Sequence, residues 1–116
     1  MLFRSSFNAQ RIEAKLENVD FEVAQARVDD FLSQYVKSGV TPDFVLADPP
    51  RAGLGKSVTA SLTRLAPPRI TIVSCDPATL ARDLAALPGY RMEQLIVVDL
   101  FPQTYHLETV VHLRKQ

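Results

Sequence analysis

The chain has a single cysteine, few glycines and no excess of either charge. One Cys among 116 residues excludes an internal disulfide and fits a reducing compartment. Lys and Arg number 13, as do Asp and Glu, so the formal net charge is zero, which is not typical of a self-sufficient nucleic-acid binder. No apolar run approaches the about 20 residues needed to span a bilayer, and the N-terminal residues lack the apolar core of a signal peptide. We therefore expect a cytoplasmic protein without a membrane partner.

Apolar periodicity predicts helices that alternate with strands. The predicted helices span residues 7–16, 24–37, 54–65 and 78–87, and the predicted strands span 18–23, 44–47, 70–74, 91–98 and 107–113. Alternating elements indicate an α/β fold with a mostly parallel sheet. The last two strands are joined by a loop without a helix, so we expect them to form an antiparallel pair.

The lone cysteine follows the strand at 70–74. Cys75 ends that strand and precedes a predicted helix, so its side chain should face the crevice in which α/β sheets bind ligands. The N-terminus of the next helix favours an anion such as a thiolate. The alternative interpretation is that Cys75 is a small buried hydrophobic residue.

Two other segments carry polar residues after or before a strand. Asp48 follows the strand at 44–47 and begins the run D-P-P-R-A-G-L. The segment 99–108 reads D-L-F-P-Q-T-Y-H-L-E and brings an acid, an imidazole and a second acid before the final strand. Together with S-C-D-P-A-T-L-A-R-D at 74–83, these segments resemble three signatures of the RNA uracil-5 methyltransferase family. The signatures read approximately D-P-P-R-x-G, S-C-N-P-x-T-L-A-R-D and D-x-F-P-H-T-x-H-x-E.

The resemblance implies roles for particular residues. Cys75 would be the nucleophile and Glu108 the general base, while Asp48 would hold either the amino-acid end of S-adenosylmethionine or the target base. Arg51 could pair with a phosphate or with Asp76, and His106 would lie near the substrate. Gln25 would contact the adenine of the cofactor. No metal is implied, and Arg82 and Asp83 are expected to make helix-surface or capping contacts.

This sequence departs from the signatures at two positions that bear on chemistry. Asp76 stands where Asn is usual and adds a negative charge beside the thiol, which would oppose thiolate formation. Gln103 stands where His is usual, which puts in doubt a substrate contact from that loop position.

The scarcity of glycine bears on the cofactor. The four glycines, at 39, 53, 55 and 89, form no G-x-G-x-x-G turn of the kind that binds a cofactor after a first strand. By the resemblance, residues 1–116 are the C-terminal part of a Rossmann-like methyltransferase catalytic domain. The cofactor turn and the RNA-binding N-terminal domain would be absent. We therefore expect the chain alone to be inactive, while the intact enzyme would methylate C5 of a uridine in tRNA or rRNA.

Two other functions remain open from the sequence. Residues 50–57, P-R-A-G-L-G-K-S, nearly match the phosphate-binding loop G-x-x-x-x-G-K-[ST] between a strand and a helix. Pro50 replaces the first Gly, which removes an N–H and makes nucleotide binding the weaker interpretation. The other alternative is a non-catalytic assembly or remnant module of the same fold. Exposed sheet edges would then support a homo-oligomer.

Overall fold

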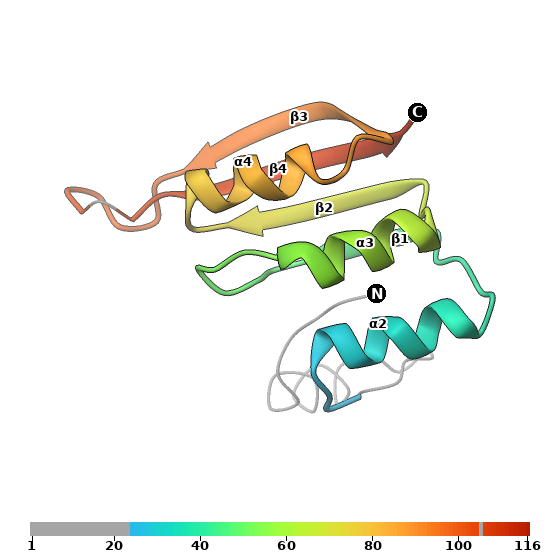
Figure 1. The fold of residues 1–116 in the computed structure, drawn as a ribbon. Coiled ribbons are helices and arrows are strands. Elements are labelled where there is room, and N and C mark those ends of the chain that lie inside the picture. The colour runs from blue at the N-terminus through green and yellow to red at the C-terminus, as the bar shows by residue number, and fades with distance from the viewer. Residues whose placement is uncertain (1–23, 105) are drawn as a thin grey trace, which may run out of the picture.

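A computed structural model describes residues 24–104 and 106–116 of the chain. Its elements are α2 (Val28–Lys37), β1 (Phe44–Ala47), α3 (Gly55–Leu65), β2 (Arg69–Ser74), α4 (Pro77–Ala85), β3 (Tyr90–Val98) and β4 (Glu108–Lys115). Figure 1 shows α3 and α4 lying across the same face of one sheet, with α2 beside α3. The helix predicted at 7–16 and the strand predicted at 18–23 lie outside the described residues.

The four described strands form a sheet in the order β1-β2-β4-β3. β1 is parallel to β2, and β4 is antiparallel to both β2 and β3. Three strands therefore run in one direction and β4 runs against them. This arrangement confirms the predicted α/β class and the terminal antiparallel pair. The sequence did not predict that the last strand inserts between β2 and β3.

Several element boundaries differ from the prediction. α2 begins at Val28, not at residue 24, because Arg27 has extended backbone angles (φ −63°, ψ 137°). Asp29 and Asp30 then stand in the first turn, where acids interact favourably with the helix dipole. α4 begins at Pro77, since proline suits the first helical position, and ends at Ala85. β4 covers Glu108–Lys115 instead of 107–113.

The core lies between the helices and the sheet. Alternate residues of β1, β2 and β4 face the helices, and the side chains between them face the opposite side of the sheet. On that opposite side, Thr71 and His112 are joined by a hydrogen bond of 2.8 Å between Oγ1 and Nδ1. The buried apolar cluster consists of Leu32, Val45, Val58, Leu62, Leu65, Ile70, Ile72, Leu80, Leu87, Val111 and Leu113.

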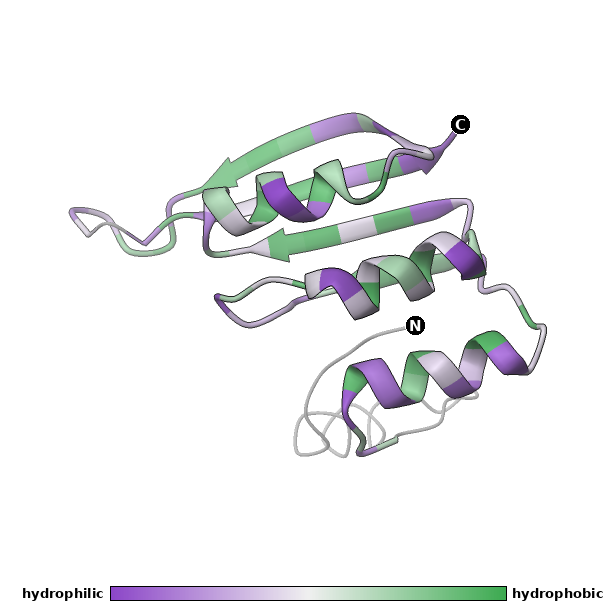
Figure 2. Cartoon of the chain, viewed as in Figure 1, coloured by the Kyte–Doolittle hydropathy of each residue, from purple (hydrophilic) through white to green (hydrophobic). Residues whose placement is uncertain are grey.

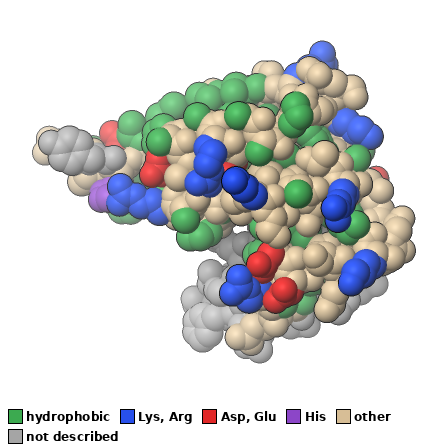
Figure 3. Space-filling model, in the orientation of Figure 1, with side chains coloured by type: hydrophobic (Ala, Val, Ile, Leu, Met, Phe, Trp, Pro, Cys, Tyr) green, Lys and Arg blue, Asp and Glu red, His purple; other side chains and the backbone are tan. Residues whose placement is uncertain are grey.

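β3 differs from the other strands because it leaves apolar side chains in solvent. Met92, Leu95 and Val97 are 49%, 48% and 55% exposed. Figure 2 shows that the sequence of β3 is hydrophobic toward its C-terminal end, and Figure 3 shows hydrophobic side chains along this side of the molecule. Among the described residues, no helix is both long and apolar enough to cross a membrane.

Candidate active site

Cys75 lies in a tight turn between β2 and α4. The hydroxyl of the buried Ser74 donates to the carbonyl oxygen of Asp76 at 3.0 Å and accepts from the Asp76 amide at 3.2 Å. These two hydrogen bonds close the turn around Cys75, whose side chain is exposed. The alternative interpretation of Cys75 as a buried hydrophobic residue is therefore wrong. Sequence reasoning did not recognise this role of Ser74, although a Ser directly before the turn residue is a common turn signal.

Asp76 is the N-cap of α4. Its Oδ1 accepts hydrogen bonds from the amides of Ala78 at 2.9 Å and Thr79 at 3.4 Å. The helix amides that were expected to favour an anionic thiol therefore bond to Asp76 instead. Because Asn carries the same Oδ1, the Asp in this chain keeps the cap and differs from the family signature by one charge. Arg51 Nε lies 3.8 Å from Asp76 Oδ2, which is the ion pair that the sequence suggested as one of two possibilities.

Glu108 begins the strand next to the one that Cys75 follows. The register of β2 with β4 pairs Ser74 with Thr109, so Cys75 and Glu108 each lie one residue beyond this pair at the same end of the sheet. Thr109 is buried among the helix-facing residues, and strand alternation therefore places the half-buried Glu108 on the other side of the sheet.

Asp48 stands at the same end of the sheet. Ala47, the last residue of β1, pairs with Ile72 in the parallel register, so Asp48 follows β1 close to where β2 leads into Cys75. Asp48 is exposed, whereas Ala47 is buried toward the helices. The backbone therefore brings Asp48, Cys75 and Glu108 to the C-terminal end of the parallel strands.

The two weaker candidates are less well fixed. His106 is exposed and lies before β4, so strand alternation does not fix which side of the sheet its side chain faces. Its amide donates to Thr104 Oγ1 at 3.3 Å. Gln25 is exposed and precedes α2, and the strand expected before it lies outside the described residues. Neither side chain has a described contact with Cys75.

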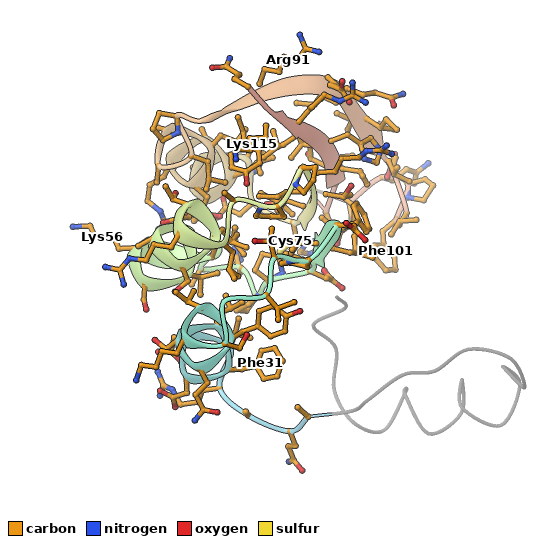
Figure 4. The ribbon with its side chains drawn as sticks, turned by 90° about the vertical axis from the view of Figure 1, so that its right-hand side faces the viewer. Phe31, Lys56, Cys75, Arg91, Phe101 and Lys115 are labelled. Carbon is orange, nitrogen blue, oxygen red and sulfur yellow. The ribbon has the colours of Figure 1, made fainter. Side chains whose placement is uncertain are left out.

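The near match to a phosphate-binding loop has an internal anion in place of a phosphate. The amides of Leu54 and Gly55, at the N-terminus of α3, donate to the Asp83 carboxylate at 2.6 and 3.3 Å. Asp83 is only 2% exposed, so its charge lies where a phosphate would have to bind. Lys56 projects from α3 into solvent (Figure 4). This arrangement argues against nucleotide binding by residues 50–57, and it confirms the expected capping role of Asp83.

The described residues contain no group of three or more His, Cys, Asp or Glu side chains that could hold a metal ion. A family model described as tRNA (uracil-5-)-methyltransferase matches residues 27–116. The chain belongs to this family.

Individual members and similar structures support the assignment. An uncharacterized RNA methyltransferase of Clostridium tetani is 42% identical over 101 residues, covering 85% of this chain and 22% of that protein. An uncharacterized RNA methyltransferase of Listeria monocytogenes is 47% identical over 100 residues, covering 85% of this chain and 21% of that protein. The crystal structure of Pyrococcus abyssi tRNA (uracil-54, C5)-methyltransferase in complex with S-adenosyl-L-homocysteine matches with a TM-score of 0.72 and 35% identity. That match covers 92% of this chain and 25% of the other.

The chain thus spans about a fifth of the length of the curated methyltransferases that it matches. The M1.HpyAVI–SAM complex matches with a TM-score of 0.64 at 15% identity and shows likeness of fold alone. In this structure the D-P-P-R, S-C-D-P and D-L-F-P segments lie at the C-terminal ends of β1, β2 and β3, the three strands that run in one direction.

Proposed function

We propose that these residues form part of the catalytic domain of an S-adenosylmethionine-dependent RNA methyltransferase that modifies C5 of a uridine in tRNA or rRNA. The observation that supports the proposal is the pairing of Ser74 with Thr109, which puts Cys75 and Glu108 at the same end of two adjacent strands in a member of the uracil-5 methyltransferase family. Asp48 at the end of β1 adds a second acid at the same place.

Cys75 supplies the nucleophile in this proposal. C5 of uracil is too poor a nucleophile to accept a methyl group directly. Addition of the Cys75 thiolate to C6 forms a C–S bond and an enolate, which makes C5 nucleophilic. Because the side chain of Cys75 is exposed, the uracil ring of a substrate RNA can reach the thiol.

Glu108 acts as the general base. After C5 has gained its methyl group, the Glu108 carboxylate accepts the C5 proton, the C5–C6 double bond re-forms and the thiolate leaves. A base that serves this step must lie near the thiol, and the start of β4 at the sheet end where Cys75 follows β2 supports this role.

S-adenosylmethionine would supply an electrophilic methyl group. Asp48 offers a carboxylate at the C-terminal end of β1, where an α/β sheet binds its ligands, and it suits either the ammonium of the cofactor or an N–H of the target base. Gln25 would contact the adenine, and Arg51 and His106 would contact RNA. Because the sequence has no G-x-G-x-x-G turn after a first strand, the 116-residue chain should not bind the cofactor measurably by itself.

The test is covalent capture by RNA that carries 5-fluorouracil at the target position. Fluorine cannot leave as a cation, so the adduct should persist and shift the protein on a denaturing gel. The assay uses the natural gene product that carries this sequence, with S-adenosylmethionine and labelled RNA. Cys75→Ala should abolish the adduct and turnover, and Gly89→Ala, where an added Cβ would meet nothing within 4 Å, serves as a control that keeps the thiol. A Cys75→Ala protein that still shifts the RNA would show that another residue is the nucleophile.

Glu108→Gln separates the base from the nucleophile. This variant should form an adduct with ordinary uracil but fail to release it, with a rate loss on the order of 10²–10⁴. Release at the wild-type rate would remove Glu108 from the proposed role.

A non-catalytic assembly module is the second candidate, and the exposed apolar side chains of β3 are the observation that favours it. In that case the chain would form a homo-oligomer through β3. Analytical ultracentrifugation distinguishes a monomer from a homo-oligomer, and Leu95→Lys on β3 should shift the chain to the monomer. A monomer at all concentrations would remove this candidate.

A further inference from the structure

We propose that Thr79, Arg82 and Asp83, on one face of α4, are positioning residues that hold the loop after β1 in place beside Cys75. Asp48 and Arg51 begin that loop, so their placement depends on α4. The catalytic consequence rests on the proposed function, whereas the contacts themselves do not.

One face of α4 makes a row of contacts with the loop backbone. Thr79 Oγ1 donates to the carbonyl oxygen of Arg51 at 3.1 Å. Arg82 Nη2 donates to the carbonyl oxygen of Ala52 at 2.7 Å. Asp83 accepts from the amide of Leu54 at 2.6 Å. Residues spaced by three and four lie on one side of a helix, so a single face of α4 fixes successive residues of the loop.

The carboxylate of Asp83 is the centre of this contact. It is buried, and Arg82 Nη2 donates to it at 2.9 Å. Hydrogen bonds to a buried charged group contribute more than ordinary ones, and leaving such a group without its partners is costly. Asp83 therefore connects α4 to the start of α3 and holds the end of the loop between β1 and α3.

Gly53 shows how closely the loop approaches α4. A Cβ on this residue would overlap Asp83 Oδ2 and would lie 2.8 Å from Arg82 Nη2. Its φ of +79° is also a left-handed value that favours glycine. The loop can therefore keep these contacts only with glycine at this position.

The consequence for the site follows from where α4 begins. The helix starts directly after the Cys75 turn and is capped by Asp76. The element that anchors the thiol thus also anchors the loop that carries Asp48 and Arg51. Misplacement of a reacting group by about 1 Å can reduce a rate by about 10²-fold. Loss of the α4 contacts should therefore slow the reaction at each intact site.

The first measurement is amide hydrogen exchange at Leu54 in the chain. Asp83→Asn keeps one acceptor and Asp83→Ala keeps none. We expect the Leu54 amide to exchange about 10-fold faster in Asp83→Asn and about 100-fold faster in Asp83→Ala. Asp43→Asn, an exposed acid before β1, is the matched control and should leave this amide unchanged. Wild-type exchange at Leu54 in Asp83→Ala would overturn the proposal.

The second measurement is the methylation rate per active site in the natural gene product. Covalent capture on 5-fluorouracil RNA counts the competent sites. A variant that merely unfolds some molecules lowers this count but keeps the rate per site. We expect Asp83→Asn and Gly53→Ala to lower the rate per site by about 10- to 100-fold, with Asp83→Asn less severe than Asp83→Ala. Gly89→Ala, where an added Cβ would meet nothing within 4 Å, should keep the wild-type rate.

The outcomes separate this proposal from the proposed function. Absence of adduct and methylation in the wild-type protein would overturn the proposed function and the catalytic part of this inference, and the exchange data would still decide whether α4 holds the loop. Normal adduct formation in the wild type, with an unchanged rate per site in Asp83→Ala, would overturn the positioning role alone.

Discussion

Replacing Asp76 tests whether its charge or its capping oxygen matters. Asp76→Asn keeps the Oδ1 that accepts from Ala78 and Thr79, and it removes only the charge that faces Arg51. That ion pair is weak by geometry, because its atoms are 3.8 Å apart and the Arg51 side chain is 82% exposed. Exposed pairs of this kind contribute about 0–1 kcal/mol. We therefore expect Asp76→Asn to change the free energy of unfolding by less than about 0.5 kcal/mol.

Asp76→Ala removes the cap as well as the charge. Loss of an N-cap costs about 0.5–2 kcal/mol, so this variant should be about 1 kcal/mol less stable than Asp76→Asn. With a urea dependence of about 1–3 kcal/mol per molar, the unfolding midpoint should fall by roughly 0.3–1 M. Equilibrium urea unfolding of the chain, followed by circular dichroism, measures both variants. Equal destabilisation by Asn and Ala would refute the capping argument, and Arg51→Ala would then have to reproduce the loss.

Three further predictions concern the core, a buried phenol and the thiol. Leu62 is fully buried, so Leu62→Ala should lower the free energy of unfolding by about 2–5 kcal/mol, whereas Leu100→Ala, at 56% exposure, should change it by less than about 0.5 kcal/mol in the same urea titration. Burial raises the pKa of Tyr90 to about 12 from its ordinary 10.0, so the unfolded chain loses the phenol proton at lower pH than the folded chain. The free energy of unfolding should therefore hold up to pH 10.0 and fall between pH 10.0 and about 12. Tyr90→Phe should remove this pH dependence. Because Cys75 is exposed, iodoacetamide should alkylate its thiol in the folded protein. Leu62→Ala should therefore change the alkylation rate, measured by mass spectrometry, by less than about twofold. A large acceleration would mean that the thiol reacts only after the protein unfolds.

Local patterns predicted the elements well because helix and strand periods differ. The strand at 44–47 and the ends of the helices at residues 37 and 65 agree with the structure. The predicted start of α2 was wrong by four residues, because the helical pattern in the sequence extends back to residue 24, whereas the backbone at Arg27 is extended. Periodicity describes which face is buried, whereas a boundary depends on the backbone of one or two residues.

The position of the last strand could not be read from local patterns. Adjacent strands joined by a short loop predict pairing, and β3 with β4 confirmed it. Nothing in residues 107–113 indicates that the strand also pairs with β2, because that contact depends on long-range packing. Yet this second pairing sets Thr109 opposite Ser74, so that Glu108 begins β4 at the sheet end where Cys75 follows β2. The candidate site residues were therefore found from the signatures, while the topology that unites them came from the structure.

The partner of the α3 amides shows how one loop sequence can serve different purposes. Residues 50–57 follow a strand and open a helix, as a phosphate-binding loop does, and sequence spacing alone leaves both interpretations open. The decision depends on which anion satisfies the amides of Leu54 and Gly55. Here the buried carboxylate of Asp83, nearly 30 residues further along the chain, takes that position at 2.6 and 3.3 Å. A helix N-terminus that would otherwise attract a ligand is thereby used to join two segments, and the loop presents Asp48 and Arg51 at the end of the sheet.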